Sequence, residues 1–155
     1  MKRILSLLCL MLMLSVVAFA KGNEMPQYDI TGAGSGNEGM LLVKVFVYSK
    51  KVTDQDLKRA AVHGVVFRGC SGNNSGAEQP AMAPAESEAS HSEFCNGFFA
   101  VQGECQNYAS IIAGSYERVK TSKGVKSGAI VQVDKKALRK ALEKAGVVRS
   151  LSAGF

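Results

Sequence analysis

The stretch MLLVKVFVYS, residues 40–49, decides the fold of this chain. Valines alternate along it with larger or charged side chains. The valines are Val43, Val45 and Val47, and the residues between and after them are Lys44, Phe46 and Tyr48. Successive side chains of a strand point to opposite faces, and β-branched residues favour strands. The stretch therefore predicts a β-strand that has one face in the core.

The residues before this strand predict a hairpin. Tyr28–Thr31 is a second short β-prone run, and the glycine-rich segment of residues 32–39 follows it directly. Such a segment favours a turn, so the two runs are expected to pair across it. The segment contains Gly34-x-Gly36-x-x-Gly39, the glycine pattern of dinucleotide-binding loops. That chemistry requires a helix to begin at the loop, and a β-prone run follows instead.

The residues after the strand predict a capped helix. Thr53 and Asp56 have the spacing of a capping box, although Asp replaces the usual Glu or Gln. The helix is expected to run from Asp54 to about His63 and to stop at Gly64. Residues 65–67, Val-Val-Phe, are then expected to form a short buried strand.

The second half of the chain predicts similar elements. A short helix is expected within residues 92–101, strands over residues 108–119 and 128–133, and a last helix that Asp134 caps. Helical spacing places four apolar residues on the inner face of this last helix: Leu138, Ala141, Leu142 and Ala145. Gly146 is expected to end the helix, and Val147–Val148 to begin a final short strand.

The order of these elements repeats within the chain. Residues 43–68 and residues 130–149 both read as strand, capped helix and Gly-Val-Val. Two such units predict an α+β fold: a mainly antiparallel sheet with two or three helices, for which a split βαβ (ferredoxin-like) arrangement is the candidate topology. Between them, residues 69–91 lack periodicity and are expected to be a flexible surface loop. Residues 21–155 are thus predicted to form a single domain.

Residues 1–20 have the features of a signal peptide. Lys2 and Arg3 precede an apolar run that ends in Ala18-Phe19-Ala20, a small-x-small cleavage site. The run is shorter than the roughly 20 residues that a membrane-spanning helix needs, and no later segment is long and apolar enough. We therefore expect an exported protein, periplasmic or extracellular, with no transmembrane span after signal removal.

Removal of that segment leaves three cysteines, Cys70, Cys95 and Cys105. In an oxidising compartment two of them could form a disulfide and leave one free thiol, and the sequence leaves all three pairings open. Residues 69–107 contain five acids and no Lys or Arg. Because nearby negative charge raises the pKa of a thiol, structural or inert cysteines are favoured over a catalytic one.

The charge distribution favours a solvated basic face and leaves an anionic partner as the alternative. The chain carries +6, and residues 115–155 alone hold ten Lys and Arg against three acids. This basic segment could attract an acidic polymer or an acidic envelope protein, or it could be a solvated face that the chain's own acids balance. The first candidate set for anion binding is Arg118, Lys120, Lys123 and Lys126, on a turn, and the second is Lys135, Lys136, Arg139 and Lys140.

Several chemistries lack the residues that they need. No serine satisfies Gly-x-Ser-x-Gly, and the histidines and cysteines lack the close, recurrent spacing of zinc ligands. No cofactor or metal site is predicted. The basic segment has only Tyr116 nearby as an aromatic for base stacking, and export removes the usual targets, so no nucleic acid is expected.

Five segments carry a resemblance to a known group of proteins. They are YDITGAGSG (28–36), LVKVFVYSKK (42–51), AAVHGVVFRG (60–69), GSYERVK (114–120) and KAGVVRSLSAGF (144–155). The chain resembles a family of small exported proteins of uncharacterised function from Bacteroidetes-type bacteria. The resemblance implies export and a compact domain, and it implies no activity.

The sequence therefore predicts an exported binding or structural protein of the cell envelope without catalysis of its own. One alternative is a small envelope enzyme that uses His91 with Cys95 or Cys105. The other is a self-assembling surface subunit. The oligomeric state is left open.

Overall fold

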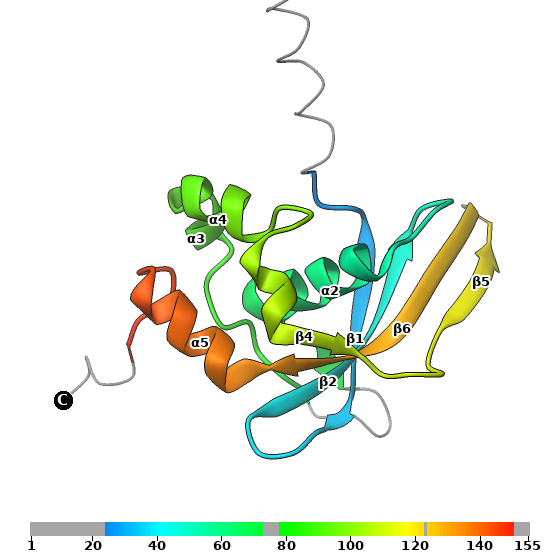
Figure 1. Ribbon diagram of the computed structural model, residues 1–155, viewed down its shortest axis with the longest axis horizontal. Coiled ribbons are helices and arrows are strands. Elements are labelled where there is room, and N and C mark those ends of the chain that lie inside the picture. Colours follow the sequence, from blue (N-terminus) through cyan, green and yellow to red (C-terminus); the bar gives the residue numbers. More distant parts are fainter. Residues whose placement is uncertain (1–23, 73–77, 123, 151–155) are drawn as a thin grey trace, which may run out of the picture.

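A computed structural model of the chain describes residues 24–72, 78–122 and 124–150. The predicted signal peptide, residues 1–20, lies outside these ranges. Within them the chain forms one small α+β domain (Figure 1). No helix of the described part has the length and apolar character to cross a membrane.

Six strands form one mixed sheet. They are β1 (Tyr28–Ser35), β2 (Met40–Tyr48), β3 (Ser71–Gly72), β4 (Ala109–Ile111), β5 (Glu117–Thr121) and β6 (Gly124–Asp134). Their order is β3-β1-β2-β6-β4, and β5 also pairs with β6. The pairing of β1 with β3 is parallel, and the other four pairings are antiparallel. The expected mainly antiparallel sheet is confirmed at this level.

The hairpin and its inward-facing valines are confirmed. β1 pairs with β2 from Tyr28 opposite Val47 to Ser35 opposite Leu41, with a register shift between Gly32 and Gly34. On the core face of β2, the side chains of Val43, Val45 and Val47 have no exposed surface. β6 lies on the other side of β2, so β2 is central in the sheet.

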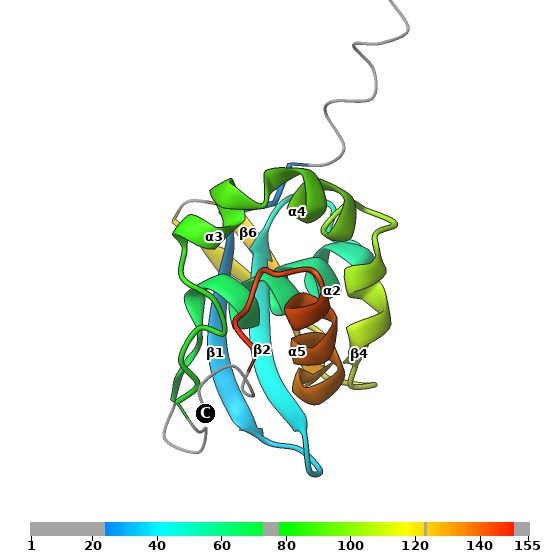
Figure 2. The same ribbon diagram turned by 90° about the vertical axis from the view of Figure 1, so that its left-hand side faces the viewer.

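The structure has four α-helices in its described part, more than the two or three expected. They are α2 (Asp54–His63), α3 (Glu86–Ser90), α4 (Ser92–Phe98) and α5 (Lys135–Lys144), and a 3-10 helix, η2, spans Glu104–Tyr108. Figure 2, which views the domain from the left of Figure 1, shows α4 and α5 in front of the strands. The inward valines of β2 are covered because α2 packs against β2 and β6.

The end of α2 differs from the prediction. The capping box of Thr53 and Asp56 is present, but Gly64 continues the helix into a π-helical turn, Gly64–Arg68. The predicted strand at residues 65–67 is therefore wrong. Gly64 has ordinary helical dihedral angles, and a Cβ there would lie 2.6 Å from the side chain of Ile30. A glycine is required at position 64 because β1 packs closely against it. Gly69, which follows the π-helical turn, has φ of +70°, a conformation that favours glycine.

The last helix begins and ends as predicted. The Asp134 carboxylate accepts a hydrogen bond from the N–H of Ala137, and Gly146 has φ of +77°. Val147 and Val148 are buried but do not form the predicted strand. Their N–H groups donate instead to the carbonyl of Leu142, at 3.0 and 3.4 Å.

The predicted strand over residues 108–119 is interrupted. β4 and β5 pair with different parts of β6, and Gly114, with φ of +75°, lies between them. The Ser115 hydroxyl fills the gap in the ladder, because it accepts a hydrogen bond of 3.0 Å from the N–H of Ile130. Two short strands, β4 and β5, separated by an irregular segment therefore replace the single predicted strand.

The predicted loop over residues 69–91 contains regular structure. It holds β3 and α3, and Met82 and Ala83 are buried, with the Ala83 N–H donating to the carbonyl of Val66 at 2.9 Å. Met82 and Ala83 therefore do not lie on the surface, as the expected surface loop would place them. A buried backbone requires such hydrogen bonds, and local apolar periodicity does not reveal them.

The strand and the capped helix of the predicted repeat are present in both halves, but the third element is not a strand in either, and the topology is not a clear split βαβ. Each half contributes an antiparallel hairpin followed by a helix: β1, β2 and α2, then β5, β6 and α5. The second strands of the two hairpins, β2 and β6, lie side by side and antiparallel at the centre of the sheet. A split βαβ unit requires parallel strands on either side of each helix, which this order does not supply.

Candidate functional site

The first predicted basic set does not converge in the structure. Arg118 and Lys120 lie on β5 opposite Ser127 and Val125, whereas Lys126 lies opposite Val119. Because neighbouring residues of a strand face opposite ways, Lys126 points to the other face of the sheet from Arg118 and Lys120. Lys123 lies outside the described residues.

Lys126 is also neutralised locally. Its Nζ lies 3.2 Å from a carboxylate oxygen of Asp29, which also accepts a hydrogen bond of 2.5 Å from the hydroxyl of Tyr48. The hydrogen bond with Asp29 raises the pKa of Lys126. The same ammonium lies 4.6 Å from the ring centre of Phe46. This lysine belongs to a satisfied cluster on the open face of the sheet.

The second predicted set lies on one surface. The structure adds Lys144, which the predicted set did not include, and we call the five residues Lys135, Lys136, Arg139, Lys140 and Lys144 the α5 basic face. At 3.6 residues per turn, these five side chains cover an arc of about 180°, and the buried Leu138 and Leu142 lie outside it. One acid, Glu143, lies within the arc and is 3.6 Å from the Arg139 guanidinium. Lys135 donates to the neutral amide oxygen of Gln79 at 2.8 Å.

Most of these charges have no anionic partner. In the part of the chain that the structure describes, Arg139 has the single ion pair of the α5 basic face. Lys136, Lys140 and Lys144 are four residues apart, so their Cα atoms are spaced by about 6 Å along the helix. Five cations against one acid on ten residues make α5 strongly cationic.

A hollow of about 470 Å³ adjoins one end of the α5 basic face. We call it the arginine hollow, because Arg139 and Arg149 line it together with His91 and apolar groups that include Pro84 and Val148. Arg149 is exposed, and the described residues supply no hydrogen bond or ion pair to it. The Nδ1–H of His91 donates to the carbonyl of Ser87 at 3.0 Å. The two guanidinium groups of the hollow suit a carboxylate or phosphate.

The three cysteines are buried and are free thiols in the structure. Burial raises the pKa of each, to about 11 for Cys105. Cys95 lines a separate hollow of about 450 Å³ with Glu24 and Glu88, and the negative charge of Glu88 raises its pKa further. His91 borders the arginine hollow, not this one. The arrangement is unsuited to thiolate chemistry, which needs a lowered pKa.

His63 is the buried centre of a hydrogen-bonded triad with Tyr28 and Glu88 that the sequence did not reveal. Its Nδ1 lies 2.6 Å from the Tyr28 hydroxyl, and its Nε2 lies 3.0 Å from a carboxylate oxygen of Glu88. Burial lowers the pKa of His63, against the opposing effect of Glu88. The imidazole is thereby held neutral, so Nε2–H donates to Glu88 and Nδ1 accepts from Tyr28.

The surroundings of the triad of Tyr28, His63 and Glu88 indicate a structural role. The rings of Phe67 and Phe99 lie 5.2 Å from the His63 ring, and His63 is 6% exposed. Burial also raises the pKa of Tyr28 above its usual range. The triad joins β1, α2 and α3 by hydrogen bonds. Because both nitrogen atoms of the imidazole have partners within the protein, His63 has no atom left for a ligand.

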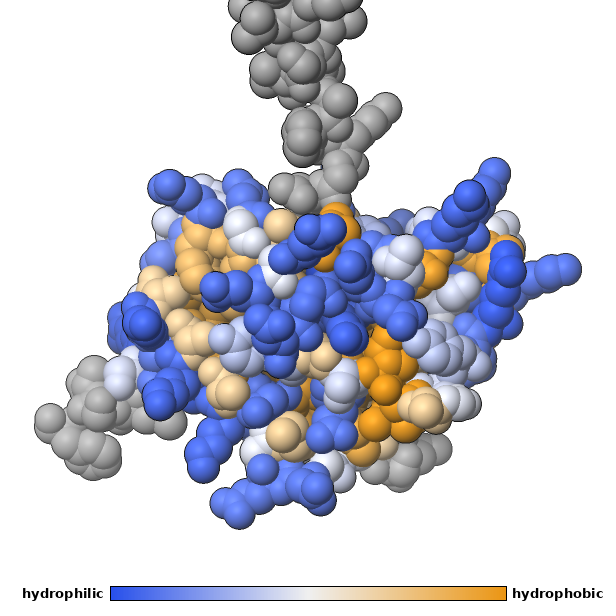
Figure 3. Space-filling view, in the orientation of Figure 1, coloured by the Kyte–Doolittle hydropathy of each residue, from blue (hydrophilic) through white to orange (hydrophobic). Residues whose placement is uncertain are grey.

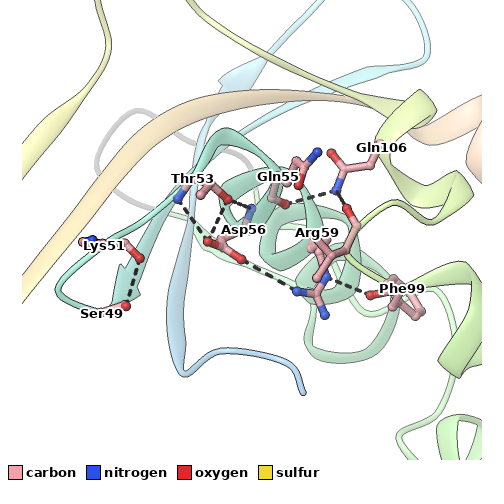
Figure 4. A network of polar contacts seen from close by, with 9 residues as sticks. Ser49, Lys51, Thr53, Gln55, Asp56, Arg59, Phe99 and Gln106 are labelled. Atoms are coloured by element: carbon pink, nitrogen blue, oxygen red, sulfur yellow. Dashed lines mark hydrogen bonds and ion pairs between the residues drawn. The ribbon is translucent and has the colours of Figure 1, made fainter. Parts of the chain in front are cut away.

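Arg59 is a second buried polar group with a structural function (Figure 4). It is 1% exposed, and its Nε donates to the carbonyl of Phe99 at 2.8 Å. The Asp56 carboxylate, which also accepts from the N–H and hydroxyl of Thr53, lies 3.7 Å from the guanidinium. From the same region, Gln106 donates to the carbonyl of Gln55 at 3.2 Å. The first turns of α2 are thus tied to the segments after α4.

The described residues contain no cluster of three or more His, Cys, Asp or Glu side chains that could hold a metal ion. Among the charged groups, the α5 basic face and the arginine hollow bring together side chains that have few partners in the described structure. Sequence reasoning placed Arg139 in its second set and did not connect it with Arg149 or His91. No regular spacing relates these three residues, because three different segments carry them.

Comparisons with known proteins add no relative. No protein-family model matches the chain, and neither the curated proteins nor the solved structures contain a significant match.

Proposed function

We propose that the protein is exported and acts in the cell envelope by binding an anionic polymer, without catalysis of its own. The ligand lies along the α5 basic face, and one of its anionic groups enters the arginine hollow. One observation carries this proposal. The cations of α5 and of the arginine hollow at its end have only one ion pair among them in the described residues, between Arg139 and Glu143.

The geometry of α5 supports binding of an extended ligand. Lys136, Lys140 and Lys144 form a row, and Arg139 leads from that row to the hollow that Arg149 also lines. A flexible polyanion can contact such a row without a deep cleft, and attraction by several charges gives fast, salt-dependent association. The separated turn residues offer no comparable row, because Arg118 and Lys120 face away from Lys126.

The alternative of a Cys/His enzyme finds less support. All three thiols are buried, and their pKa values are raised, so little thiolate forms at neutral pH. The alternative of a self-assembling subunit has no observation that favours it here. It predicts concentration-dependent elution from a sizing column, whereas a binding protein of this kind elutes independently of concentration.

The test compares two triple variants for binding of fluorescently labelled poly-L-glutamate. The first is Lys136→Gln/Lys140→Gln/Lys144→Gln, on α5. The matched control, Arg118→Gln/Lys120→Gln/Lys123→Gln, removes the same charge from the turn. Exposed charge pairs contribute about 0.5 kcal/mol each, so the α5 variant is expected to bind roughly tenfold more weakly.

The control variant loses the same net charge as the α5 variant but keeps the α5 basic face, so it is expected to bind within about twofold of the wild-type chain. Equal weakening by both variants would mean that net charge alone attracts the polymer. Weakening by the control only would assign the ligand to the turn. Either result would overturn the α5 site, and absence of binding by the wild-type chain would overturn the proposed function.

A further inference from the structure

A second surface with the chemistry of a ligand site lies between α4, η2 and α5. We call it the aromatic groove. Its apolar wall is formed by Phe94, Phe98, Tyr108, Ala141 and Ala145, around a hollow of about 430 Å³. A neighbouring hollow of about 330 Å³ shares Phe94 and Phe98 and extends the groove past Gly97. Figure 3 shows an apolar strip over α4 and α5 with hydrophilic residues around it.

The aromatic residues of the groove are held in fixed positions by one another. The rings of Phe94 and Phe98 are stacked, with centres 5.1 Å apart and planes 21° apart, and Tyr108 lies 5.8 Å from Phe98. Phe98 is buried, whereas Phe94 and Tyr108 are partly exposed. A prearranged aromatic wall of this kind favours a planar, apolar group, because little side-chain freedom is lost on binding.

The rim of the groove carries charges of both signs. Glu104 and Lys144 line the larger hollow, and Glu93 and Glu104 line the smaller one. In the described part of the chain none of these three side chains has an ion pair or a hydrogen bond. An anion alone would meet two carboxylates, and a cation alone would meet Lys144. A ligand with one charge of each sign complements both.

We propose that the aromatic groove binds a small aromatic zwitterion, such as a free aromatic amino acid. The ring lies against Phe94, the ammonium faces Glu104, and the carboxylate faces Lys144. The volume of the larger hollow lies within the range of roughly 300–1,000 Å³ that is typical of small-molecule sites. The inference does not rest on the anionic-polymer site, although Lys144 belongs to both sites.

The chain contains no tryptophan, so the fluorescence of added L-tryptophan reports its own binding. The comparison uses N-acetyl-tryptophan, which lacks the ammonium, tryptamine, which lacks the carboxylate, and N-acetyl-tryptophanamide, which lacks both. L-tryptophan is expected to bind most tightly, and loss of either charge is expected to weaken binding roughly fivefold. Equal binding of N-acetyl-tryptophanamide would mean that the groove accepts an uncharged aromatic residue of a peptide, and it would overturn the proposal. So would absence of binding.

Variants on the rim separate the groove from the rest of α5. Glu104→Gln and Lys144→Gln are each expected to weaken L-tryptophan binding roughly fivefold, without a change in the circular dichroism spectrum. Lys140→Gln is the matched control, because it removes the same charge from α5 outside the groove. It is expected to leave L-tryptophan binding unchanged while it weakens poly-L-glutamate binding. Equal losses for Lys140→Gln and Lys144→Gln in the L-tryptophan assay would contradict the assignment.

Discussion

Replacement of His63 by glutamine tests whether the buried imidazole is neutral and makes the stability of the domain depend on pH. Glutamine offers one donor and one acceptor near the positions of Nε2 and Nδ1, so it can satisfy Glu88 and Tyr28 without titrating. Desolvation lowers the pKa of His63, and the cations of Arg68 and Arg59 act in the same direction. The folded state therefore resists protonation at this site.

The sign and size of the effect follow from proton linkage. An unfolded histidine has a pKa of about 6.5, so below this pH the unfolded chain binds a proton that folded His63 does not. The contribution of His63 to stability is present above about pH 6.5 and is lost as the pH falls through the lowered pKa of the folded state. In that window the free energy of unfolding decreases by up to about 1.4 kcal/mol per pH unit.

The assay is urea unfolding of the wild-type chain and of His63→Gln at several pH values between neutral and mildly acidic. The wild-type chain is expected to lose stability steadily over this interval, and His63→Gln is expected to lose little. The variant is expected to be about 1 kcal/mol less stable near neutral pH, because it loses ring packing. An unchanged slope in His63→Gln would refute the reasoning.

Three further outcomes test the packing, the thiols and the helix cap. Gly128→Ala is expected to cost about 2 kcal/mol in urea unfolding, because a Cβ there would lie 2.5 Å from the ring of Phe46, whereas Gly97→Ala, which meets no atom within 4 Å, should cost nothing. Cys105, whose pKa burial raises to about 11, should react with maleimide at neutral pH only when the chain unfolds, and fast labelling of the native chain would contradict this. Thr53→Ala should cost about 1 kcal/mol of stability through loss of the cap, and an unchanged unfolding midpoint would contradict that.

The sequence predicted the elements whose signals are local. The alternation of Val43, Val45 and Val47 predicted the central strand, and the pair Thr53 and Asp56 predicted the start of α2 to the residue. Capping groups and period-two burial act within a few residues of chain, so they can be read without knowledge of the fold.

The elements that were missed depend on distant residues. Gly64 was predicted to end α2, but it has helical dihedral angles and continues the helix. A glycine is required there because the side chains of Ile30 and Tyr28, from β1, lie against it. The buried Ala83 likewise depends on the carbonyl of Val66, in the π-helical turn. Such hydrogen bonds and close contacts leave no periodic trace in the sequence.

The same difference between local and distant signals explains why only part of the candidate site was predicted. The charges of α5 are local and were recognised. Proximity along the chain suggested that the residues from Arg118 to Lys126 act together, but strand alternation sends Lys126 to the opposite face, toward Asp29. The arginine hollow combines Arg139 with Arg149 and residues near α3, and only the packing of the chain brings these together.

The most direct measurement of the central claim is the reactivity of each lysine toward an acylating reagent, with and without poly-L-glutamate, read by mass spectrometry. The account predicts that the polymer protects Lys136, Lys140 and Lys144. Lys120 on β5 and Lys58 on α2 should keep the reactivity that they have in the free protein. Protection of Lys120 with unchanged reactivity of the α5 lysines would contradict the account.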